Sequence, residues 1–182
     1  MTRYVALLRG INLGRRRVKM EVLRELVEQL GMARVSTFIA SGNVIFETFG
    51  DESMALEERL EAHFEQSLGY AVPTVVRTAA DVERIAGHDA FPGSAPPTGD
   101  AGVFVSFLKH PPTDMQRDKT LALATPTDEL AFAGRELYWL CRTRMSESPL
   151  FKGDSLAKNG PVGTMRKMTT VRELAARMAG PG

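Results

Sequence analysis

The feature that most constrains this chain is the order in which two hydrophobic periodicities follow one another over residues 1–87. Short apolar runs are typical of strands, whereas apolar residues spaced three or four apart are typical of amphipathic helices. These patterns occur in the order strand, helix, strand, strand, helix, strand, over residues 4–8, 20–30, 35–40, 44–47, 51–68 and 72–76. This is the succession of the split βαβ, or ferredoxin-like, fold. We therefore expect an α+β protein whose N-terminal half is ferredoxin-like.

A segment rich in proline and glycine separates this half from the rest of the chain. Residues 88–101 contain three prolines, two glycines and no periodic pattern, which indicates a linker or a long loop. Beyond it, strand patterns and two capping-box sequences repeat the order strand, helix, strand, strand, helix, with no clear last strand. The sequence thus predicts an α+β subdomain over 1–87, a connection over 88–101, and a related, incomplete βαββα half with a C-terminal helix over 102–182.

Two stretches of the first half resemble a known bacterial family. The stretches are YVALLRGINLG at residues 4–14 and SGNVIF at residues 41–46, with Met20, Leu23 and Arg24 between them. They are similar to the signature of a family catalogued as domain of unknown function 1697. Residues 164–171 resemble the C-terminal Thr-x-Arg-Asn-Trp-Asn-Thr stretch of that family, although Lys167 begins a departure from it, and Arg15 stands where a glycine is expected. The resemblance implies an α+β fold with ferredoxin-like elements and no particular reaction, cofactor or partner.

Composition excludes several other classes of protein. The chain has 182 residues, of which 43% are hydrophobic, so it is long enough to bury a core. Cys141 is its one cysteine, which excludes a disulfide scaffold. No apolar run approaches the length of a membrane span, and residues 1–20 do not have the pattern of a secretory signal. We therefore expect a soluble cytoplasmic protein that is not bound to a membrane.

Charge is distributed unevenly, although the net charge is only +1. Residues 1–20 hold six basic and no acidic side chains, residues 21–100 are strongly acidic, and residues 142–182 are basic again. If the two ends meet, they form a positive patch that favours an anionic ligand. The alternative is that the basic ends are solvated or lie against the acidic helices. The balanced total disfavours, without excluding, a nucleic-acid partner.

The loop after the first strand is the best candidate for a binding site. Successive amides around Gly10 and Gly14 can form an anion-binding concavity, and Arg9 can bind phosphate with two parallel hydrogen bonds. A turn at residues 41–43 and the C-terminal basic cluster complete the candidate site. Its ligand-binding residues are Arg9, Gly10, Asn12, Gly14, Ser41, Gly42, Asn43 and Arg166. The alternative interpretation is structural: the glycines supply turn geometry, and Arg9 and Asn12 hold the loop by hydrogen bonds.

The sequence contains no recognisable catalytic or metal-binding set. The three histidines are far apart in the sequence, and neither an acid/base pair nor an activated nucleophile is evident. Glutamates at 57, 58, 61 and 65 form a helical stripe that we expect on a solvated exterior. We therefore assign no catalytic residue, metal or cofactor, and leave open whether the protein is an enzyme.

Three functions remain after these exclusions. The first is a small module that binds an anion, either a nucleotide or a phosphorylated metabolite, through the loop after the first strand. The second is a nucleic-acid-associated protein that uses the basic ends. The third is a homodimeric or other protein-interaction unit without a small-molecule site.

Overall fold

The chain divides into two compact units. The computed structural model describes every residue except 13, 15, 16, 40, 41, 51, 96, 100, 154, 181 and 182. The first unit is Met1–Arg84 with Arg172–Gly182, and the second is Ile85–Val171. This division differs from the predicted one because residues 172–182 join the first unit rather than the second. Among the described residues, no helix is long and apolar enough to cross a membrane.

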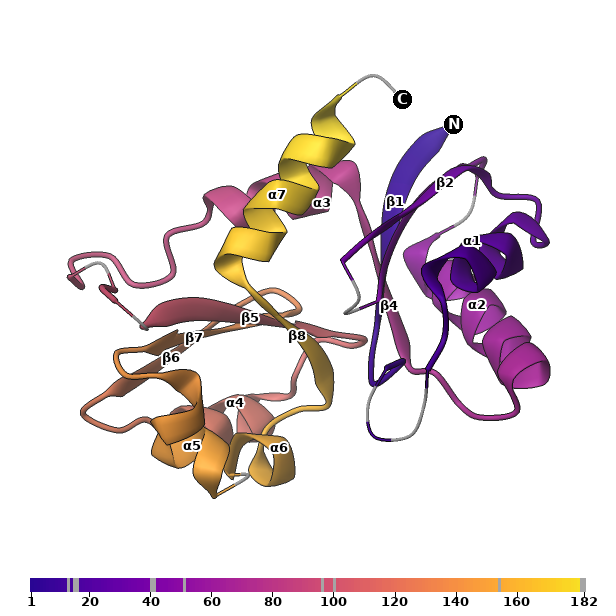
Figure 1. Cartoon of the computed structure of the whole chain (residues 1–182). Helices are drawn as coiled ribbons and strands as arrows, with labels where there is room; N and C mark the ends of the chain where they lie inside the picture. The colour runs from indigo at the N-terminus through magenta and orange to yellow at the C-terminus, as the bar shows by residue number, and fades with distance from the viewer. Residues whose placement is uncertain are drawn as a thin grey trace. The chain divides into compact units, whose positions relative to one another are not determined.

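The first unit contains a four-stranded antiparallel sheet in the order β2-β3-β1-β4, which is the ferredoxin-like arrangement (Figure 1). Its elements along the chain are β1 (Thr2–Leu8), α1 (Met20–Glu28), β2 (Ala33–Phe38), β3 (Asn43–Thr48), α2 (Ser53–Leu68), β4 (Thr74–Thr78) and the first part of α3 (Ala79–Gly87), which continues into the second unit at Ile85. The α+β class and the ferredoxin-like N-terminal half predicted from the sequence are thereby confirmed.

One face of this sheet carries the main core of the unit. Successive strand residues point to opposite faces, so Tyr4, Ala6 and Leu8 share the face that packs against α1 and α2. The second helix supplies the other side of the core, because Leu56, Leu60 and Phe64, which recur every four residues, are fully buried. The apolar side chains of the helices and of the sheet therefore form one buried layer.

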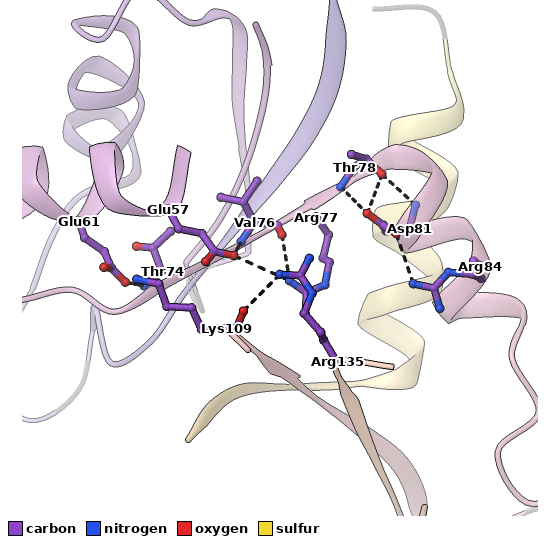
Figure 2. A network of polar contacts seen from close by, with 10 residues as sticks. All are labelled: Glu57, Glu61, Thr74, Val76, Arg77, Thr78, Asp81, Arg84, Lys109 and Arg135. Carbon is purple, nitrogen blue, oxygen red and sulfur yellow. Dashed lines mark hydrogen bonds and ion pairs between the residues drawn. The ribbon is translucent and has the colours of Figure 1, made fainter. Parts of the chain in front are cut away.

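The outer edge of β4 is covered by carboxylates (Figure 2). Every second amide of β4 points away from β1: Thr74 N donates to Glu61 Oε1 at 2.9 Å, Val76 N to Glu57 Oε1 at 2.9 Å, and Thr78 N to Asp81 Oδ2 at 3.3 Å. Two of these acids come from α2. The expected solvated stripe on that helix is thus partly wrong, because Glu57 is fully buried and both Glu57 and Glu61 satisfy strand amides.

Glu57 also neutralises a buried cation. Its Oε1 lies 3.8 Å from Nη1 of Arg77, and both side chains are almost completely inaccessible. The Arg77 guanidinium donates in addition to the carbonyl of Val76 at 2.9 Å. A buried carboxylate is tolerated when it is paired and hydrogen-bonded, and Glu57 meets both conditions.

The C-terminal end of α7 (Met168–Ala179) is bound to the first unit by arginine side chains. Nη1 of Arg3 on β1 donates to the carbonyls of Met178, at 3.0 Å, and Gly180. Arg3 also pairs with Glu47 at 2.7 Å, and this hydrogen bond lowers the pKa of the Glu47 carboxyl below its usual range. The Arg177 guanidinium lies 4.3 Å from the centre of the Phe38 ring. These contacts account for the assignment of residues 172–182 to the first unit.

The second unit repeats the same strand order. Its antiparallel sheet has the order β6-β7-β5-β8. Its elements are β5 (Gly102–Leu108), α4 (Asp114–Leu121), β6 (Asp128–Ala133), β7 (Glu136–Cys141), a 3-10 turn η1 (Met145–Glu147), α5 (Pro149–Lys152), α6 (Ser155–Asn159) and β8 (Gly163–Lys167). The presence of β8 corrects the prediction of an incomplete half. This strand begins with glycine, ends with Arg166 and Lys167, and lacks a continuous apolar run.

A buried carboxylate organises the second unit. Asp128 Oδ1 accepts from Trp139 Nε1 and Ser148 Oγ, both at 2.8 Å. Its Oδ2 accepts from the hydroxyls of Thr125 at 2.7 Å and Thr127 at 3.0 Å. Burial raises the pKa of Asp128, but these four hydrogen bonds outweigh it and hold the pKa below the usual value of 3.8.

Replacing Glu57 should test how far the first unit depends on its buried carboxylate. We expect Glu57→Ala to reduce the free energy of unfolding by on the order of 3–5 kcal/mol, because the substitution removes both the acceptor for Val76 N and the counter-charge of Arg77. Urea denaturation measures the loss. The matched control is Glu58→Ala, an exposed neighbour on the same helix, which should change stability by less than about 0.5 kcal/mol. Equal losses in the two variants would contradict this account.

The carboxylate of Asp128 should make stability depend on pH. Its folded pKa is lowered, so its contribution is present above pH 3.8 and is lost as pH falls below that value. We expect Asp128→Asn to be less stable than the parent at neutral pH, and the difference to shrink below about pH 4. Denaturant midpoints of the parent and the variant, measured from about pH 3 to about pH 7, check this. The matched control is Asp118→Asn, at an exposed position of α4, which should change stability by less than about 0.5 kcal/mol at neutral pH.

Candidate functional site

The loop between β1 and α1 turns at two glycines. Gly10 has φ +70° and Gly14 has φ +63°, a left-handed conformation that glycine adopts without the strain of other residues. The amide of Arg9 donates to the carbonyl of Pro73 at 2.9 Å, so the loop begins fixed to the segment before β4. The glycines therefore supply turn geometry, as the structural interpretation of the loop expects.

Two polar side chains hold the remainder of this loop. Asn12 Oδ1 accepts from the amide of Val18 at 2.8 Å. Arg17 Nη1 donates to the carbonyls of Asn12 at 3.3 Å and Gly14 at 3.0 Å. Asn12 thus holds the loop by a hydrogen bond, as expected if the loop residues serve the structure. The holding role of Arg17 was not predicted, because a run of arginines gives no signal of which member folds back on the backbone.

The turn before β3 packs against the same loop. The amide of Leu8 donates to the carbonyl of Gly42 at 2.8 Å. Gly42 has φ +78°, and a Cβ placed on it would lie 2.7 Å from Ile11 Cγ2 and 3.0 Å from Leu8 Cβ. The structure therefore brings Gly42 together with the end of β1 and the loop that follows it, as the candidate site requires.

The other members of that turn have different positions. Asn43 is fully buried, and its Nδ2 donates to the carbonyl of Phe38 at 2.9 Å across the connection between β2 and β3. Its side chain therefore stabilises the turn. Ser41 lies outside the described residues.

Arg9 differs from Arg3 and Arg17, two other arginines near the loop, in how its side chain is bound. Its side chain is exposed, and its guanidinium forms no hydrogen bond or ion pair with the residues that the structure describes. By contrast, Arg3 pairs with Glu47, and Arg17 binds loop carbonyls. Arg9 is thus an exposed cation beside the glycine turns, with no counter-charge among the described residues.

Arg166 lies on β8 of the second unit. Its Nη1 donates to Thr164 Oγ1 at 2.9 Å and to the carbonyl of Met165 at 2.8 Å. Burial of the guanidinium lowers the pKa of Arg166 to about 10. Arg9 and Arg166 belong to different units, so a joint site that contains both stays a prediction.

The structure offers no cluster of metal-ligand type within the part of the chain that it describes. No group of three or more His, Cys, Asp or Glu side chains there is arranged to hold a metal ion. Cys141 is buried, and desolvation raises the pKa of its thiol, which disfavours the nucleophilic thiolate. The candidate site is therefore defined by Arg9 and the glycine turns beside it.

Comparison with known proteins places the chain in a family. A family model described as protein of unknown function (DUF1697) matches residues 1–138. The chain belongs to this family. The match confirms the resemblance drawn from residues 4–14 and 41–46, and it includes the whole of the β1–α1 loop.

A solved structure shows that the fold of this DUF1697 chain occurs elsewhere. The conserved bacterial protein SP0830 from Streptococcus pneumoniae is similar, with a TM-score of 0.75 and 22% sequence identity over 99% of each chain. The likeness shows a shared two-half α+β fold. None of the curated proteins matches the chain.

The contact at Gly42 should be sensitive to a single methyl group. We expect Gly42→Ala to destabilise the first unit more than Gly50→Ala, because both glycines have positive φ but only Gly42 faces close neighbours. Backbone strain should cost each variant roughly 1–3 kcal/mol, and the clash with Ile11 and Leu8 should add about 1–3 kcal/mol to Gly42→Ala alone. Urea denaturation of the two variants checks this. If they lose equal stability, the close approach does not constrain the loop.

Proposed function

We propose that this protein binds a small phosphate-bearing anion, a nucleotide or a phosphorylated metabolite, at the loop between β1 and α1. The observation that carries the proposal is the exposed Arg9 guanidinium, which has no counter-charge among the described residues. A guanidinium binds phosphate through two parallel hydrogen bonds, and this geometry is more specific than a point charge. Arg9 is therefore the residue proposed to contact the ligand.

The backbone beside Arg9 supports the same proposal. Gly10 and Gly14 turn the chain with left-handed φ values, and no Cβ at either position blocks the approach of a ligand to the backbone. Gly42 allows the second turn to pack closely on Leu8 and Ile11. In the proposed site these three glycines shape the rim.

The asparagines have a supporting role in the proposal. Asn12 accepts from Val18 N, and Asn43 donates to the carbonyl of Phe38, so both side chains hold backbone that a ligand would meet. The N-terminus of α1 is a weaker attraction for an anion, because Glu21 lies in its first turn. Binding should therefore depend on Arg9 more than on the helix dipole.

Thermal unfolding with paired ligands tests the proposal. The probes are inorganic phosphate, AMP with adenosine as its control, and glucose 6-phosphate with glucose as its control. A ligand at a hundred times its dissociation constant adds about 2.7 kcal/mol, which corresponds to roughly 5–11 °C in the unfolding midpoint. We expect at least one phosphorylated probe to raise the midpoint and its unphosphorylated control to leave it unchanged.

Substitution of Arg9 locates the site. Arg9→Ala should weaken binding by roughly 10- to 100-fold, because a charged hydrogen bond is lost, while the stability of the unliganded protein stays within about 0.5 kcal/mol. The matched control is Arg172→Ala, an exposed arginine on α7 with the same change in charge. Equal affinity in the two variants, or no response to any phosphorylated probe, would contradict the proposal. A response to oligonucleotides alone that falls steeply with salt would favour nucleic-acid binding instead.

A further inference from the structure

One edge of the second sheet is formed by β6, and within the described part of the chain the one strand it pairs with is β7. A two-residue turn at Gly134 and Arg135 joins these strands, and Ala133 pairs with Glu136 on either side of it. In such a hairpin the two residues that flank the turn exchange both backbone hydrogen bonds, and the pattern then alternates along the strand. Ala133 and Ala131 therefore direct their backbone groups toward β7, whereas Phe132 and Leu130 direct theirs outward.

Contacts at the far end of β6 agree with this alternation. Asp128, two residues before Leu130, also faces outward, and it exchanges backbone hydrogen bonds with Thr125 at 3.0 and 3.2 Å. Thr127 belongs to the residues whose backbone groups point toward β7, and its carbonyl accepts from the amide of Arg142 at 2.9 Å. The outward backbone groups of Asp128 are therefore bonded within the chain, and Leu130 and Phe132 are the next outward-facing residues along β6.

The outward groups of these two residues are open. Leu130 and Phe132 are half-buried, and no described residue forms a hydrogen bond with their outward N–H and C=O groups. The edges of the first sheet are different. Side-chain carboxylates accept from the outward amides of β4, and β2 carries a register shift between Ala33 and Ser36.

Residues 130–133 of β6, beyond its two acidic residues Asp128 and Glu129, also lack the usual protection of an edge strand. Natural proteins block such edges with charges, prolines or bulges. Residues 130–133 are Leu-Ala-Phe-Ala, and their register with β7 is regular. An apolar, regular edge with two open backbone positions is suited to pairing with another strand.

We propose that β6 pairs antiparallel with β6 of a second copy of this chain, with the twofold axis at Ala131. In this register Leu130 of each copy lies opposite Phe132 of the other, and all four outward groups of each strand form hydrogen bonds. The two copies of Ala131 form the pair at the axis, where Cα atoms approach to about 4.5 Å and small side chains fit. The strand is therefore complementary to itself in a single register, which identifies a second copy as the occupant.

The register also places unlike residues opposite each other away from the axis. Glu129 of one copy faces Ala133 of the other, so the two carboxylates do not meet. Because the added contact is one strand pair, we expect reversible association that depends on protein concentration. The surface lies in the second unit and is independent of the anion site proposed at Arg9.

Sedimentation velocity over a concentration series, with amide hydrogen exchange at Leu130 and Phe132, tests the pairing. We expect a monomer–dimer equilibrium in which these two amides exchange freely in dilute solution and become protected as the dimer forms. A chain that stays monomeric throughout would overturn the proposal and leave the edge to a strand of a different protein. A dimer in which both amides still exchange freely would overturn it equally, because the interface would lie elsewhere.

Two lysine substitutions on one face of β6 separate this register from others. Ala131→Lys places two like charges opposite each other at the axis and should abolish the dimer. Ala133→Lys, two residues along the same face, places its charge opposite Glu129 of the second copy rather than opposite another lysine. Because Glu129 already pairs with Arg142 of its own chain, this variant should preserve association without strengthening it. Circular dichroism confirms that both variants are folded. Equal effects of the two substitutions on association would contradict the proposed register.

Discussion

Backbone amides and carbonyls at a sheet edge must form hydrogen bonds with the protein when they are buried and can bind water when they are exposed, and this chain treats its edges in both ways. On β4 the partners are carboxylates, of which Glu57 and Glu61 come from α2. The same helix turns Leu56, Leu60 and Phe64 into the core, so its orientation on the sheet satisfies both the strand amides and the apolar layer. On the outward side of β6 the described residues supply a partner at Asp128 alone, and the two open positions beyond it motivate the proposed self-pairing.

Hydrogen bonding to the backbone also distinguishes the side chains that hold the β1–α1 loop from those that can bind a ligand. Asn12, Arg17 and Asn43 use their side chains to bind backbone groups of the turns. Arg9 has no such task among the described residues, and its charge remains exposed. Among the described residues of this segment, Asn12 and Arg17 therefore hold the loop, whereas Arg9 can bind a ligand. The proposal of anion binding depends on this distinction.

The sequence predicted those features that depend on periodicity. Continuous strands and amphipathic helices such as β1 and α1 are encoded by nearest neighbours along the chain, so the ferredoxin-like first half and its order were accessible. β8 was missed because five residues with two basic ones at the end show no strand pattern. The burial of Glu57 was also missed, because only the fold reveals that Val76 needs its carboxylate. Likewise, the glycine signature indicated a turn at Gly42, but its contact with Ile11 depends on how β1 and β3 pair.

The most direct test of the proposed anion site is a titration followed by amide NMR spectra, with inorganic phosphate and AMP added to the isotope-labelled protein. We expect saturable shifts of the amides of Gly10 and Gly14 and of the Arg9 side-chain Nε–H, with adenosine producing none of them. Saturable shifts confined to other residues would place the anion elsewhere, and an unchanged spectrum would remove phosphate binding from the function of this protein.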